Sequence, residues 1–108
     1  MKEIEFLGSS LDDLRGFPPV ARRLCGFELS TVQEGRDPSD WKPMSTVGPG
    51  VREIRVRERS GAYRVIYLAT LKDTVYVLHC FSKKSPKTPR EALDVAKARY
   101  KELIRSKE

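Results

Sequence analysis

The stretch VREIRVRERSGAYRVIYLAT, residues 51–70, determines the fold. Its first part, Val51–Arg59, alternates charged and apolar residues, as a strand with one wet face and one buried face does. Ser60-Gly61 is a hairpin-turn signal, and the run Tyr63–Thr70 that follows is rich in β-branched and aromatic residues. We therefore predict a two-stranded antiparallel hairpin.

The patterns on either side extend this hairpin into an α+β domain. They predict a strand over 2–7, a short helix capped by Ser9 or Ser10, a helix over 19–35 closed by Gly35, a loop over 36–50, a Lys72-Asp73 turn, a strand over 75–82 and a last helix ending near Arg105. The order is β-α-α-β-β-β-α. We expect two helices on one face of a mostly antiparallel sheet, with the last helix capping an edge or rim.

The last helix has a start signal and an apolar stripe of its own. Thr88-Pro89-Arg90-Glu91 reads as a capping box with proline at the first helical position. Apolar side chains then recur at helical spacing at Leu93, Ala96, Tyr100 and Leu103. We expect this stripe to be buried against the sheet.

Length and composition predict one domain spanning residues 1–108. No run approaches the length of a membrane span, and the acidic start Met1–Glu5 does not resemble a signal peptide. Cys25 and Cys80 lie in apolar surroundings, which predicts reduced thiols and a cytoplasmic location. One His and two Cys do not supply a usual zinc site, so no metal or other cofactor is expected.

Charge divides the chain into two unequal parts. Residues 1–41 carry five Lys or Arg against eight Asp or Glu, whereas residues 42–108 carry sixteen against seven. The basic part alternates with strand-forming residues, so it belongs to a folded sheet and not to a tail. This asymmetry predicts one face that binds a polyanion.

The basic residues concentrate at strand ends. The run VLHCFSKKSPKTP, residues 77–89, carries Lys83, Lys84 and Lys87 directly after a strand, beside Pro86 and Pro89, which we expect to stiffen the loop. Such a run is either a solvated loop or a polyanion site on a rigid support, and we favour the second.

An arginine in a buried strand is the strongest single site signal. Arg64 lies in a strand that is otherwise apolar, where an arginine is rare unless it is paired or functional. Across the hairpin, Arg55 can face Arg64, with Glu53 and Arg57 on the same side. Glu53 is either a general base or the carboxylate that holds Arg55 or Arg64, and we favour the second. Arg57 is either a substrate contact or part of a solvated face.

With these motifs in hand, the sequence resembles the RelE/ParE toxin superfamily of bacterial toxin–antitoxin systems. Within that superfamily it is closer to the HigB branch, whose members are often labelled phage-derived Gp49-like proteins. The resemblance covers nearly the whole chain, and four segments carry it: Lys42-Pro43, Gly50–Arg55, Ser60–Tyr67 and Phe81–Pro89. It implies a RelE-like α+β toxin that binds the bacterial ribosome and cuts mRNA. It also implies a neutralising antitoxin partner, commonly a helix-turn-helix protein.

The resemblance also implies roles for individual residues. Arg64 matches the arginine of the family's Tyr-Arg strand motif, which contacts the scissile phosphate, and Arg55 matches a basic residue on the neighbouring strand. Lys83 and Lys84 match a basic pair after the last strand. A lysine crowded by cations has a lowered pKa, which suits proton transfer. The further expected substrate contacts are Lys42, Lys87, Arg57 and Trp41, of which Trp41 is either a base-stacking residue or a side chain folded back onto the core.

The general base is not identified by this pattern. Several superfamily members use a tyrosine or histidine near the C-terminal end, and residues 84–99 contain neither. Tyr100 lies on the apolar stripe of the last helix, and His79 alternates with Val75, Val77 and Phe81, so we expect both in or near the core.

Two other functions stay open from the sequence. A ParE-like protein shares the fold and inhibits DNA gyrase, and a phage remnant without catalysis simply binds nucleic acid. The convergent cations Arg55, Arg64, Lys83 and Lys84 favour the nuclease, since an inhibitor that binds a protein needs no such set.

Overall fold

The computed structural model describes residues 1–71, 73–84 and 87–108, and the chain forms an α+β fold with a five-stranded mixed sheet. The elements are β1 (Glu3–Phe6), α1 (Ser10–Arg15), α2 (Pro19–Gln33), β2 (Trp41–Pro43), β3 (Val51–Glu58), β4 (Gly61–Leu68), β5 (Thr74–Lys83) and α3 (Arg90–Lys107). The strand order in the sheet is β1-β5-β4-β3-β2. β1 runs parallel to β5, and the other neighbours are antiparallel.

The hairpin predicted from residues 51–70 is confirmed. β3 and β4 pair from Val51 with Leu68 to Glu58 with Gly61, and this register sets Arg55 opposite Arg64. β4 and β5 are internal strands, as their apolar faces predict. The predicted turn between them includes Lys72, which lies outside the described residues.

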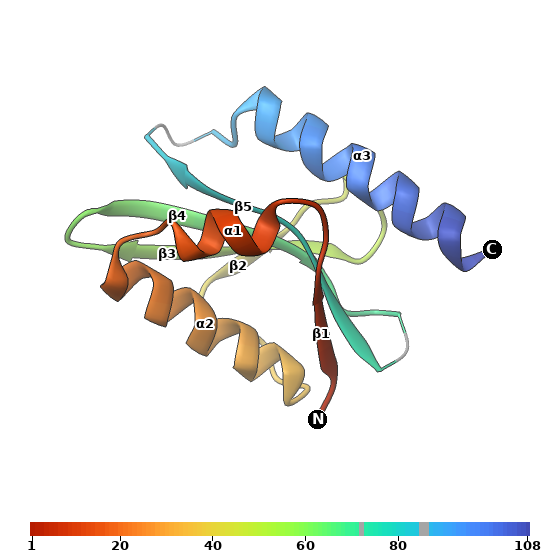
Figure 1. Cartoon of the computed structure of the whole chain (residues 1–108), viewed down its shortest axis with the longest axis horizontal. Helices are drawn as coiled ribbons and strands as arrows, with labels where there is room; N and C mark the ends of the chain where they lie inside the picture. The colour runs from red at the N-terminus through yellow and green to blue at the C-terminus, as the bar shows by residue number, and fades with distance from the viewer. Residues whose placement is uncertain (72, 85–86) are drawn as a thin grey trace.

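Two hydrophobic cores cover the two faces of the sheet (Figure 1). The first core joins α1 and α2 to one face, through residues such as Leu14, Cys25, Leu29, Ile54 and Val65. The second core joins α3 to the opposite face, through Ala96 and Leu103 against Ile66, Leu68 and Leu78. The prediction that the last helix caps an edge or rim is therefore wrong, because its buried stripe packs on a full face of the sheet.

The segment 36–50 is not entirely loop, as the sequence had suggested. Trp41–Pro43 forms β2, a short edge strand that pairs with Ile54, Glu53 and Arg52 of β3. Three residues ending in a proline carry no strand signal of their own, and their extended conformation depends on pairing with β3. The observed element order therefore contains one strand more than the predicted order.

Helix ends agree with the sequence in one case and differ in another. Gly35 follows α2 with a φ of 84°, and its N–H bonds the Val32 carbonyl, as a glycine that ends a helix does. The capping box predicted at Thr88 does not form: Pro89 is the N-cap, and α3 begins at Arg90. The Thr88 hydroxyl instead donates a hydrogen bond of 3.0 Å to Glu53. The hydroxyl thus donates to a buried carboxylate, and it does not accept a bond from a backbone N–H at the start of α3.

A β-bulge in β5 changes which side chains share a face. Ile66 pairs with His79, but the next residue, Tyr67, pairs with Val77, so Leu78 is inserted between them. Val77 lies in the first core, whereas His79 stacks on Phe81, which packs against the second core. The predicted alternation of His79 with Val75 and Val77 is therefore wrong.

Candidate functional site

Cations from four strands meet on the face of the sheet that α3 covers. Val51 of β3 packs in the second core, and every second side chain of a strand lies on the same face. The side chains at positions 53, 55 and 57 therefore point to this face. Register then places five residues beside Glu53 on the same face: Lys42, Arg55, Arg57, Arg64 and Lys83. We call these six residues the cation cluster.

Glu53 is the fully buried centre of the cation cluster. Its Oε1 lies 3.5 Å from Nε of Arg64 and 3.7 Å from Nζ of Lys42, and its Oε2 accepts the hydrogen bond from Thr88. One carboxylate thus faces two cations and anchors Thr88, two residues before the start of α3. Of the two roles predicted for Glu53, this geometry matches the one that holds Arg64.

Arg64 is nearly buried, with 9% of its side chain exposed. Its Nη1 donates to the Tyr63 carbonyl at 3.2 Å, while its Nε lacks a hydrogen-bond partner among the described residues. Burial lowers the pKa of the Arg64 guanidinium, Glu53 opposes that effect, and Arg55 adds to it. An unfilled donor on a buried cation is a position that an anion can occupy.

Lys83 and Lys84, predicted as a pair, have different surroundings. Lys84 is exposed, whereas Lys83 is only 6% exposed, and its Nζ has no hydrogen-bond partner within the described part of the chain. Burial lowers the pKa of the Lys83 ammonium, Arg64 lowers it further, and Glu53 partly offsets both. Strand alternation at the end of β5 sends the first lysine toward the cluster and the second toward water.

Arg55 is held by a residue that the sequence analysis missed. Its Nε and Nη2 donate to Oδ1 of Asp40 at 3.1 and 2.9 Å, and its backbone N–H donates to the Asp40 carbonyl at 2.8 Å. Asp40 comes just before β2, and only the unexpected pairing of β2 with β3 brings it there. No local pattern in the sequence signals this contact.

Two hollows open onto the cation cluster. One is a cleft of about 530 Å³ under the β3–β4 turn, lined by Arg57, Arg64, Lys83 and Lys84 among others. The second, of about 120 Å³, is lined by Asp40, Arg55, Val56, Arg57 and Arg64. Arg57 and Arg64 line both, so an extended anionic chain that passes over them has cations on either side.

The other predicted substrate contacts lie outside this cluster. Trp41 pairs with Ile54, so its ring is on the opposite face of the sheet, where the Arg52 guanidinium stacks 3.8 Å from its centroid. Lys87 is exposed in the segment before α3. Pro86, expected to stiffen that segment, is outside the described residues.

The two candidates considered for the general base also lie apart from the cluster. Nδ1 of His79 is 4.0 Å from the Asp13 carboxylate; burial lowers the pKa of this imidazole, Arg99 lowers it further, and Asp13 opposes both. Tyr100 packs against Gly48 in the second core, as predicted.

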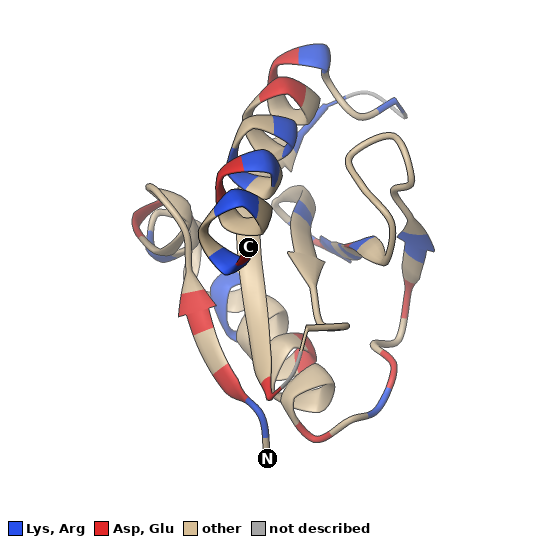
Figure 2. Cartoon of the chain, turned by 90° about the vertical axis from the view of Figure 1, so that its right-hand side faces the viewer, with Lys and Arg blue, Asp and Glu red and all other residues tan. Residues whose placement is uncertain are grey.

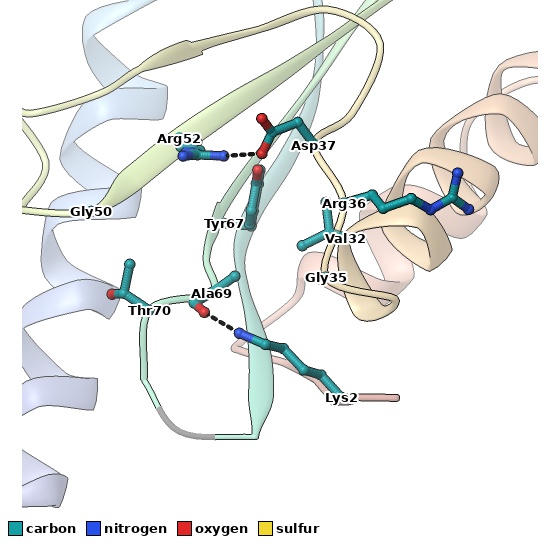
Figure 3. Close-up of a pocket in the computed structure, with 10 residues that line it drawn as sticks. All are labelled: Lys2, Val32, Gly35, Arg36, Asp37, Gly50, Arg52, Tyr67, Ala69 and Thr70. Carbon is teal, nitrogen blue, oxygen red and sulfur yellow. Dashed lines mark hydrogen bonds and ion pairs between the residues drawn. The ribbon is translucent and has the colours of Figure 1, made fainter.

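A further pocket of about 160 Å³ lies between α2 and the sheet (Figure 3). Arg52 donates to Asp37 at 2.9 Å at its rim, and Lys2 donates to the Ala69 carbonyl. Tyr67 lines it, and burial raises the pKa of its phenol. The cations of this pocket are already paired, unlike Lys83.

Acidic residues are more frequent in the first part of the chain and basic residues in the rest. In Figure 2 the first strand, β1, carries acidic residues, and α3 carries basic and acidic residues in turn along its length.

Among the residues with described positions, no three His, Cys, Asp or Glu side chains gather as metal ligands would. Nor does any helix of the described ranges have the length and hydropathy to cross a membrane.

Residues 12–101 match a known protein family, described as "Phage derived protein Gp49-like (DUF891)". The chain belongs to the Gp49-like family. This family is part of the RelE/ParE-like toxin group, so the resemblance read from the sequence is confirmed at that level. The match runs from α1 through most of α3 and includes the whole cation cluster. A search of curated proteins found no match.

Proposed function

We propose that this Gp49-like protein is the toxin of a HigB-like toxin–antitoxin pair and a ribosome-dependent endoribonuclease that cuts mRNA. One observation supports this most directly: Arg64 and Lys83 are buried cations with unfilled donors beside an open cleft. A phosphodiester supplies an anion for Lys83 and a second anion for Arg64, whose Nε already lies 3.5 Å from Glu53. The toxin family supports the biological role, and the resemblance supports the ribosome as the place of cleavage.

The proposed reaction involves only the RNA, the protein and water. The ribose 2′-oxygen attacks the adjacent phosphorus, and the bond from phosphorus to the 5′-oxygen breaks. The products are a 2′,3′-cyclic phosphate and a free 5′-hydroxyl. The proton of the 2′-hydroxyl passes to water in the cleft, and the leaving 5′-oxygen takes a proton from Lys83.

Five members of the cation cluster, and Lys84 beside it, then have defined tasks. Arg64 binds the non-bridging oxygens, on which negative charge grows in the transition state. Lys83 acts as the acid, and its lowered pKa brings proton donation closer to neutral pH. Glu53 orients Arg64, and Arg55, fixed by Asp40, neutralises the neighbouring phosphate. Arg57 and Lys84, at the cleft rim, guide the RNA strand.

The test is to induce the protein in a bacterial host and map mRNA 5′ ends. We expect new 5′-hydroxyl ends inside translated frames, and we expect Arg64→Ala to abolish them. Arg36→Ala is the matched control, because Arg36 is exposed and pairs with Glu34 at the end of α2. Folding of each variant is checked by its melting curve.

Two outcomes would overturn the nuclease assignment, and a third would remove only Arg64 from it. Growth arrest with intact mRNA would point to gyrase inhibition, the ParE-like alternative. Equal cleavage by wild type and Arg64→Ala would remove Arg64 from the site. A soluble, folded protein that causes no arrest would favour a phage remnant that only binds nucleic acid.

A further inference from the structure

Lys83 is the amine of the cation cluster that has no anionic partner of its own. Only 6% of the residue is exposed, and its Nζ has no hydrogen-bond partner within the described part of the chain. By contrast, the ammonium of Lys42, in the same cluster, faces the Glu53 carboxylate at 3.7 Å. A buried ammonium without a partner costs free energy, and this cost favours the neutral amine.

The charges around Lys83 favour the neutral amine as well. Burial lowers the pKa of the Lys83 ammonium most, and Arg64 is the next largest cause. Lys42 and Arg55 lower this pKa further, against the opposing effect of Glu53. A neutral amine is the nucleophilic form of a lysine, so Lys83 combines burial with the capacity to attack an electrophile.

An anion site lies directly beside this amine. Ala62 pairs with Lys83 and Arg64 pairs with Phe81, so Arg64 and Lys83 are diagonal neighbours on one face, within reach of each other's long side chains. Both line the cleft of about 530 Å³, together with Arg57. A cleft of this size admits a small molecule, whereas an amine so little exposed does not reach into the active site of a modifying enzyme.

We propose that this cleft binds small acyl phosphates and that Lys83 is the site to which they transfer their acyl group. The phosphate oxygens bind the guanidinium groups of Arg64 and Arg57. The carbonyl carbon, one bridging oxygen away from the phosphorus, then lies at the amine of Lys83.

The transfer balances without a further reactant. The neutral Nζ of Lys83 attacks the carbonyl carbon, and a bond forms between this nitrogen and that carbon. The bond from the carbon to the bridging oxygen breaks, and phosphate leaves with the electron pair. The nitrogen gives its proton to the departing phosphate, so the products are an Nζ-acyl-lysine and hydrogen phosphate.

Acylation changes the cation cluster in a defined way. It removes the charge of Lys83, so Glu53 no longer shares its charge among three cations. It also removes the proton that the leaving 5′-oxygen takes in the proposed reaction. Only this last consequence rests on the proposed function: a chain acylated at Lys83 is expected to cut no mRNA.

The test incubates the purified full chain with acetyl phosphate at neutral pH. Acetylation of each lysine is followed over time by mass spectrometry, after digestion by a protease that does not cut at lysine. We expect Lys83 to be acetylated at least about fivefold faster than the exposed Lys84, because bound reagent lies next to the Lys83 amine. An excess of inorganic phosphate is expected to slow the reaction of Lys83 and to leave that of Lys84 unchanged.

A control reagent and a pair of variants separate guidance by the anion site from simple reactivity. The N-hydroxysuccinimide ester of acetic acid carries no phosphate, and we expect it to acetylate Lys84 at least as fast as Lys83. Arg64→Gln is expected to slow acetylation of Lys83 by acetyl phosphate at least about threefold, through loss of a phosphate contact. Arg36→Gln, at the exposed end of α2, is expected to change nothing. Melting curves verify the folding of both variants, and competition by phosphate needs no variant.

Three results would each overturn the inference: equal rates at Lys83 and Lys84, a Lys83 rate that phosphate does not slow, or the same preference for Lys83 with the uncharged reagent. None of these readouts involves RNA. Selective acylation of Lys83 in a protein that cuts no mRNA would refute the nuclease alone. Cleavage of mRNA by a protein without selective acylation would refute the acyl-transfer site alone, and cleavage by the acylated chain would refute the loss of activity.

Discussion

Replacing Lys83 by methionine is expected to make the protein more stable and less active. The ammonium of Lys83 is buried without a hydrogen-bond partner in the described part of the chain, and the only nearby carboxylate, Glu53, already faces Arg64 and Lys42. Three cations thus share one anion. Methionine is unbranched and only one atom shorter than lysine, and it removes the third charge.

The expected size of the effect comes from the cost of a buried charge. Removing an ion from a protein interior in favour of an apolar group of similar volume stabilises by about 1–4 kcal/mol. Water in the adjoining open cleft reduces the cost, so we expect the lower half, about 1–2 kcal/mol. For a domain of about 100 residues, each kcal/mol raises Tm by about 4–8 °C.

The pH dependence has a definite sign. The folded-state pKa of Lys83 lies below its ordinary value of 10.5, so the unfolded chain holds this proton more tightly. The destabilisation is therefore fully present below the folded pKa. It fades as the pH rises from the folded pKa toward 10.5, and the Tm difference between Lys83→Met and wild type shrinks over that range.

Thermal melts followed by circular dichroism measure these differences, with Lys84→Met as the matched control. Lys84 is the exposed neighbour, and its replacement is expected to change stability by no more than about 0.5 kcal/mol. Sulfate, an anion of the right charge for the cluster, is expected to raise Tm of wild type more than that of Lys83→Met. A Lys83→Met protein that melts below wild type, or equal effects of both changes, would refute the reasoning.

Two further changes test the packing around the site and the second core. Glu53→Gln keeps the shape but leaves Arg64 with an uncompensated buried charge, so we expect a loss of about 3–5 kcal/mol in urea unfolding; an unchanged midpoint would mean that Glu53 is not the counter-ion. Gly48→Ala places a Cβ 2.4 Å from the ring of Tyr100 and is expected to cost about 1–3 kcal/mol. Gly26→Ala, its control in the exposed middle of α2 with no atom within 4 Å of the new Cβ, is expected to stabilise by about 0.5–1 kcal/mol; the opposite order of the two Tm values would contradict the packing.

Local signals were sufficient to predict most of the secondary structure. Alternation over 51–59 and the Ser60-Gly61 turn predicted the hairpin and placed Arg55 opposite Arg64, because a short turn leaves few registers. Helical spacing predicted α2 and its end at Gly35. These features depend on residues close together in the chain.

Features that depend on distant residues were missed. β2 exists because β3 supplies hydrogen-bond partners, and it brings Asp40 to Arg55. The Leu78 bulge turns His79 to the other face, and single-strand alternation cannot reveal it. Thr88, read as a helix cap, bonds a carboxylate that is distant in sequence.

The sequence by itself determined which residues are cationic, which strands are buried and on which side of the hairpin Glu53, Arg55 and Arg57 lie, since periodicity and charge are local properties. Only the tertiary structure decided that Lys83 is buried while Lys84 is exposed. It also decided that one carboxylate serves two cations and that α3 covers the face that carries them. Burial and the balance of charge are set by what packs above a side chain, and that neighbour comes from elsewhere in the chain.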